Sequence, residues 1–91
     1  MAADRIPSRI VLPFGFRITI KQVSPKDPLL HVADDEYLDG AWYADERMIV
    51  LNKALPPRKR RYLFTHELAH ALADFQHEMF LTNKAKPTGD N

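Results

Sequence analysis

The segment from Pro56 to Leu81 constrains the fold most, because it is long and its apolar residues recur with helical spacing. Wound as a helix, it places its apolar side chains on one stripe: Phe64, Leu68, Ala71, Leu72, Phe75 and Met79. The stripe follows two prolines, and proline suits the first turn of a helix, where the amide protons lack helical partners. The sequence therefore predicts a helix from about Pro57 to Phe75 that is buried on one side.

The same segment carries the motif His66-Glu67-x-x-His70. Residues four apart lie one above the other on a helix, so the two imidazoles should project in the same direction, with His77 on the same side. Two imidazoles on one helical face are the usual start of a zinc site, and zinc hydrolases keep a general base at the position of Glu67. An ordinary solvated face would favour Lys, Glu and Arg over clustered histidines. The pattern predicts bound Zn²⁺.

Strands are predicted before this helix. Residues 16–21 alternate apolar and polar side chains, which is typical of a half-buried strand. Ala41–Tyr43 and Met48–Leu51 should form a hairpin with its turn at residues 44–47, and the continuous apolar run of the second strand indicates burial on both faces. The expected fold is α+β, a small antiparallel or mixed sheet of three or four strands packed on one long helix. The side chains expected to meet in its core are Phe64, Leu68, Leu72 and Phe75 from the helix, and Ile18, Ile20, Ile49 and Leu51 from the sheet.

Length and composition limit the remaining possibilities. The 91 residues predict a single domain, with an ordered core at about 9–81, a loose lead-in and a polar, frayed tail at 82–91. The absence of cysteine excludes disulfides and thiolate zinc sites and fits a cytoplasmic protein. No apolar run has membrane-spanning length, so no membrane partner is expected.

Arg58-Lys59-Arg60-Arg61 is the one strong run of charge. Such clusters bind nucleic acid in some proteins, but the net charge of +1 gives no general reason to expect that partner. We interpret the run as a solvated first turn of the helix. Its position near the positive end of the helix dipole is electrostatically unfavourable and unexplained by the sequence.

The stretch from Leu38 to Glu78 resembles the zincin metallopeptidases, and is most similar to the ImmA/IrrE-like and other minimal zincin families. The specific part of the resemblance is the helical motif within residues 62–70, and the strand pair before it agrees in pattern. The resemblance implies that His66 and His70 bind zinc and that Glu67 is the catalytic base. It also implies that the edge strand at 41–43 binds an extended peptide, a mode that β-augmentation explains physically.

The sequence departs from these families at the third zinc ligand. ImmA/IrrE-like enzymes take an acidic ligand from a later helix, which is not predicted here. Metzincins use a glycine and then a His or Asp, but Ala73 and Gln76 occupy these two positions. The candidates that remain on the helix are Asp74, His77 and Glu78.

His77 is the predicted third ligand, because imidazole is a preferred zinc ligand and this residue lies on the same side of the helix as His70. In a straight helix it would rise about 10 Å beyond His70, too far to share one ion. The prediction therefore requires a break near residues 74–76. His31 ranks fourth, because its position favours a surface loop.

These features predict a zinc-dependent metallopeptidase that acts on a peptide or protein substrate, with Tyr43 as a possible donor to the oxyanion. Two alternatives stay open. One is a non-catalytic, zinc-binding regulatory module that needs a partner chain. The other is a small nucleic-acid-binding domain that uses the basic run Arg58–Arg61.

Overall fold

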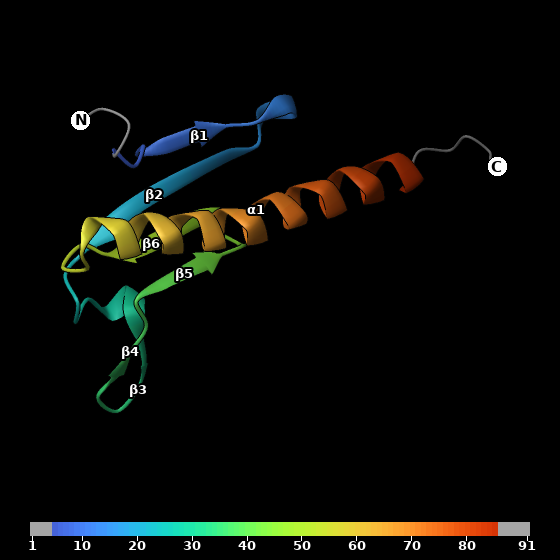
Figure 1. Cartoon of the computed structure of the whole chain (residues 1–91). Helices are drawn as coiled ribbons and strands as arrows, with labels where there is room; N and C mark the ends of the chain where they lie inside the picture. Colours follow the sequence, from blue (N-terminus) through green and yellow to red (C-terminus); the bar gives the residue numbers. More distant parts are fainter. Residues whose placement is uncertain (1–4, 86–91) are drawn as a thin grey trace.

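A computed structural model describes residues 5–85 of the chain (Figure 1). Its main sheet contains four strands and is mixed. The strand order is β1-β2-β6-β5, which leaves β1 and β5 at the two edges. β2 and β6 pair in parallel, whereas the other two pairs are antiparallel. The strands of this sheet are β1 (Arg9–Val11), β2 (Arg17–Val23), β5 (Gly40–Tyr43) and β6 (Met48–Asn52). The predicted α+β architecture is therefore confirmed.

The predicted hairpin is formed by β5 and β6. Trp42 pairs with Ile49 and Gly40 with Leu51, and a turn at residues 44–47 connects the strands. Between β2 and β5 the chain makes a short 3-10 helix, Pro28–Leu30, and a small separate ladder. That ladder consists of β3 (His31–Ala33) and β4 (Glu36–Tyr37).

The core lies between the sheet and the single long helix α1 (Pro57–Ala85). The alternation in β2 has the predicted effect, since Ile18 and Ile20 are buried, whereas Arg17, Thr19 and Lys21 are exposed. In β6, Ile49, Val50 and Leu51 are all completely buried, which confirms a strand covered on both faces.

The predicted apolar stripe faces the sheet, but the helix is rotated so that Ala71 rather than Leu72 lies in the core. Ala71 is completely buried, whereas Leu72, an expected core residue, is 38% exposed. Phe64, Leu68 and Phe75 are only partly buried at the margins of the core. The physical reason is that a helix comes closest to a sheet where its side chains are small, so the row through Ala71 turns inward.

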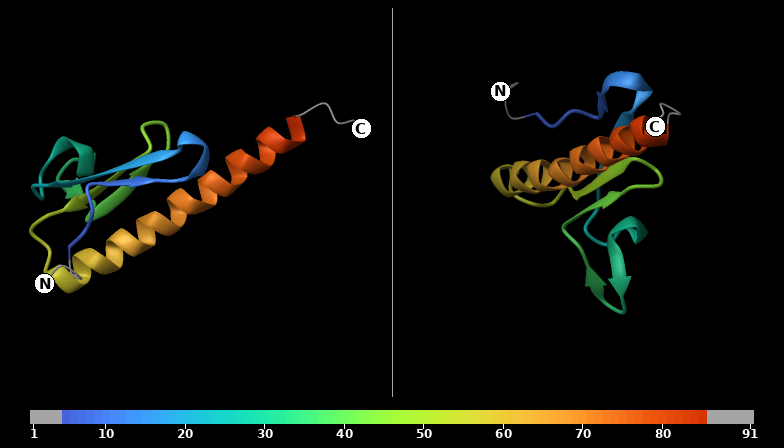
Figure 2. Two further views of the ribbon diagram at one scale, coloured as in Figure 1. Left: turned by 90° about the horizontal axis from the view of Figure 1, so that it is seen from above. Right: turned by 90° about the vertical axis from the view of Figure 1, so that its right-hand side faces the viewer.

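The helix is also longer than predicted. It continues past Phe75 to Ala85, and its C-terminal part extends beyond the sheet (Figure 2). No glycine or proline occurs between Phe75 and Pro87 to interrupt it. The predicted frayed tail was therefore wrong for residues 82–85, while residues 1–4 and 86–91 lie outside the described part of the chain. Within residues 5–85, no helix combines the length and the apolar character needed to cross a membrane.

The orientation of α1 can be tested with two identical substitutions. Ala71→Leu should lower the free energy of unfolding by about 1–3 kcal/mol, because added methyl groups overpack a filled interface. Ala73→Leu, at an exposed position of the same helix, should leave that free energy nearly unchanged. Urea unfolding followed by circular dichroism measures both, and equal stability of the two variants would contradict the observed orientation.

Candidate metal centre

The two histidines of the motif lie together on an exposed side of α1. The ring centroids of His66 and His70 are 4.9 Å apart, and the rings are nearly perpendicular. Tyr62, one turn earlier, stacks on the His66 ring with a centroid separation of 6.5 Å. Both imidazoles are accessible to solvent, and no hydrogen bond ties either ring to another described residue. The pair is therefore available to an ion from outside.

Glu67 points in another direction from the histidines. It is only 9% exposed and lies on the side of α1 that packs against the sheet. Its neighbour there is Gly40, the first residue of β5, where a Cβ atom would lie 3.8 Å from Glu67 Cγ and 3.2 Å from Leu51 Cδ2. Gly40 therefore lies beside the helical turn that carries Glu67, and a side chain there would press on Leu51 rather than on the helix.

The Glu67 carboxylate has no hydrogen bond or ion pair with any residue among 5–85. Burying a charged group without a partner is costly, so folded proteins rarely do it without a functional reason. The motif thus places two accessible imidazoles and one buried glutamate within about one turn of α1. Of these, His66 and His70 are of the ligand type that zinc prefers, so two of the ligands that a zinc site would need lie together on this side of the helix.

A third protein ligand is not assembled among the described residues. No group of three His, Cys, Asp or Glu side chains within residues 5–85 is placed to hold a metal ion. The helix is continuous through His77, so the break that this ligand would need near residues 74–76 is not found. Asp74 instead accepts a hydrogen bond of 2.6 Å from Trp42 Nε1, and Glu78 pairs with Arg47 at 2.7 Å.

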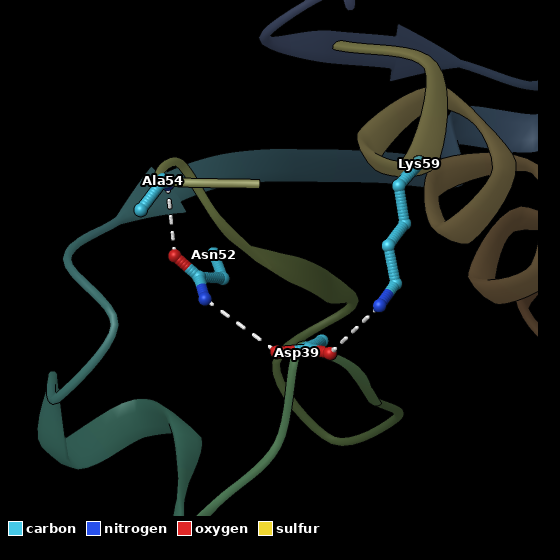
Figure 3. A network of polar contacts seen from close by, with 4 residues as sticks. All are labelled: Asp39, Asn52, Ala54 and Lys59. Carbon is cyan, nitrogen blue, oxygen red and sulfur yellow. Dashed lines mark hydrogen bonds and ion pairs between the residues drawn. The ribbon is translucent and has the colours of Figure 1, made fainter. Parts of the chain in front are cut away.

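The basic run at the start of α1 is partly used inside the molecule. Lys59 Nζ lies 3.8 Å from Asp39, the residue immediately before Gly40 (Figure 3). The Asn52 side chain donates to the same carboxylate at 3.5 Å and accepts from the Ala54 amide at 2.9 Å. These contacts join the end of β6, the beginning of β5 and the first turn of α1, which holds Gly40 opposite the helix.

Arg60 makes a second set of contacts at this end. Its guanidinium donates to Gln22 Oε1 at 3.0 Å and to the Lys53 carbonyl at 3.3 Å. The interpretation of the run as a purely solvated turn was therefore too simple, because Lys59 and Arg60 attach the helix start to the sheet. Both cations therefore have partners within the molecule at this end of the helix, where the dipole disfavours positive charge.

Tyr43, which was considered as a donor to the oxyanion, uses its hydroxyl elsewhere in the fold. Its hydroxyl donates to the Leu29 carbonyl and so fixes the 3-10 helix beneath the sheet.

Sequence reasoning also missed the part that Gly40 plays, since the Asp39-Gly40 pair was interpreted only as a turn signal. The signal that could have found it is the position of a glycine at the start of a strand, which often marks a close approach.

Comparison with known proteins gives one match. The family model described as the IrrE N-terminal-like domain, peptidase family M78, matches residues 13–90. No curated protein and no solved structure gives a significant match to the chain.

The cost of burying Glu67 can be measured directly. In the presence of a chelator, Glu67→Gln should raise the free energy of unfolding by about 1 kcal/mol, because it removes an unpaired buried charge and keeps the shape. Glu46→Gln, at an exposed position in the β5–β6 turn, is the matched control and should have no effect. Urea unfolding compares the two, and a clear loss of stability in Glu67→Gln would show that the carboxylate has a stabilising partner.

Proposed function

This chain belongs to the family of IrrE N-terminal-like domains, and we propose that it acts within that family as a zinc-dependent metallopeptidase. One observation carries the proposal. A buried glutamate without a partner among residues 5–85, Glu67, lies in the same helical turn as two accessible imidazoles and packs beside Gly40, the first residue of an edge strand. That combination is costly for stability and is accounted for if the carboxylate works on a water molecule.

His66 and His70 would hold the ion through their ring nitrogens, which must be neutral to coordinate. When bound, zinc supplies a Lewis acid that makes water a stronger acid and polarises a carbonyl group. Glu67 then takes the proton from the water as it attacks the peptide carbonyl and passes that proton to the leaving amine. Because Glu67 directly follows His66 on the helix, its side chain points in a different direction from those of the ligands His66 and His70.

The substrate would lie along β5. This strand is an edge of the sheet, so one side of its backbone has no neighbouring strand among the described residues. An extended peptide can add to such an edge through main-chain hydrogen bonds. The close approach at Gly40 puts the beginning of this edge next to Glu67, which would bring a bound peptide to the base.

The proposal keeps His77 as the third zinc ligand. His77 would join His66 and His70 if α1 bends after His70, since the straight helix leaves it about 10 Å farther along the axis. The expected compartment is the cytoplasm, because the sequence contains no cysteine.

A second candidate function is a non-catalytic zinc-binding module that is completed by a partner chain. It is favoured by the lack of a third suitably placed ligand group among residues 5–85. Zinc binding without hydrolysis would support this candidate over the peptidase.

Metal binding tests the ligand assignment. The purified chain should bind one zinc ion, and His70→Ala should lose most of it, since one remaining imidazole is a weak site. His31→Ala is the matched control, because His31 lies in the β3–β4 ladder against the Asp34 carbonyl and the Tyr37 ring. Zinc content after gel filtration is measured by elemental analysis. Equal zinc content in His70→Ala and wild type would refute the site.

Hydrolysis tests the role of Glu67. Glu67→Gln should retain zinc but cleave an unstructured protein substrate about 10²–10⁴-fold more slowly, because the proton acceptor is lost. Glu46→Gln serves again as the control and should cleave at the wild-type rate. Cleavage is followed by mass spectrometry, and activity that survives in Glu67→Gln would assign the reaction to another base.

A further inference from the structure

A pocket lies along α1 beyond the histidine pair, between the helix and the β5–β6 turn. Its volume is about 340 Å³, and it is separate from the histidine pair. Its walls combine apolar and acidic side chains: Phe16, Trp42 and Leu81 with Asp45, Asp74 and Glu78. The three candidates for a third zinc ligand, Asp74, His77 and Glu78, all line this cavity.

The charges of this pocket are only partly balanced. Glu78 is neutralised by Arg47, whose guanidinium also lies 4.0 Å above the Phe16 ring and is therefore held in place. Asp74 accepts a hydrogen bond from the Trp42 indole, a neutral donor that leaves the negative charge uncompensated. Asp45 has no hydrogen bond or ion pair with the residues described in 5–85. Two carboxylates are thus left to attract a cation.

The cation that suits this pocket is organic. The residues described do not include a group able to hold a metal ion, although three carboxylates and His77 are close by. Apolar walls match the aliphatic stem of a long basic side chain, whose charged end can reach a carboxylate. The Trp42 ring in the wall also favours a flat guanidinium, which stacks on aromatic faces.

The pocket is in line with the proposed substrate path. β5 runs along α1, because Gly40 adjoins Glu67 while Trp42 bonds to Asp74, two helical turns later. The rise from His70 to His77 is about 10 Å along the helix axis. An extended peptide covers that distance in about three residues.

We propose that this pocket binds a basic side chain, preferably arginine, of a peptide that lies along β5, about three residues from the bond that is cleaved. The inference rests on the proposed peptidase function for its reference to a cleaved bond. Its binding part rests only on the pocket, the two unbalanced carboxylates and the edge strand.

The binding part can be measured without catalysis. Trp42 is the only tryptophan in the chain, so its fluorescence reports directly on this pocket. The probes are blocked alanine-based peptides that carry one arginine or, as the neutral isostere, one citrulline. The arginine peptide should change the fluorescence saturably and bind at least about fivefold more tightly than the citrulline peptide. Equal binding of the two peptides, or no binding of either, would overturn the proposal.

Two variants identify the carboxylates. Asp74→Asn and Asp45→Asn should each weaken arginine-peptide binding about three- to fivefold, a size typical of partly exposed charge pairs. In Asp74→Asn the amide oxygen can still accept the hydrogen bond from the Trp42 indole, so the pocket wall should be preserved. Asp35→Asn, in the exposed turn between β3 and β4, is the matched control and should bind like wild type. An equal loss in Asp35→Asn would assign the effect to general charge and overturn the proposal.

The link to hydrolysis is tested separately. Cleavage sites in an unstructured protein should show arginine or lysine enriched about three residues from the cleaved bond, and Asp74→Asn should remove this enrichment. Cleavage by wild type without any such enrichment would overturn the proposed position of the pocket in the substrate path. If the chain binds the arginine peptide selectively but cleaves nothing, the peptidase proposal fails and the binding pocket stands.

Discussion

The packing of α1 on the sheet is the contact on which the rest of the structure depends. Its core contains the small, completely buried side chain of Ala71 together with Ile18 and Ile49 of the sheet. Because protein interiors are close-packed, a small side chain at this point lets the helix lie close to the sheet. Larger side chains then fill the margins, as in the edge-to-face contact of Phe16 with Phe75 at a centroid distance of 5.1 Å.

This close packing has a direct consequence for Glu67. The residue occupies the row that turns inward, so its carboxylate is buried although its two histidine neighbours in the motif are exposed. A buried glutamate without a partner is rare in folded proteins. If Glu67 acts as the proposed base, its retention at this interface exchanges stability for activity.

Polar contacts keep β5 aligned with α1 over its whole length. Lys59 reaches Asp39 before the strand, Trp42 bonds to Asp74 within it, and Arg47 at the end of the turn pairs with Glu78. Exposed contacts of this kind contribute little to the free energy of unfolding. Their effect is to fix the direction of the edge strand relative to the helix, so that the motif and the acidic pocket lie along one path.

The sequence by itself determined the long helix, the β5–β6 hairpin, the buried alternation of β2 and the pairing of His66 with His70. Each of these is encoded by the spacing of neighbouring residues, which local periodicity reveals. Only the tertiary structure decided that Ala71 rather than Leu72 faces the sheet, that Glu67 is buried beside Gly40, and that Asp74 and Glu78 line a pocket away from the histidines. These features depend on contacts between residues far apart in the chain, where the size of one side chain determines how closely another element can approach.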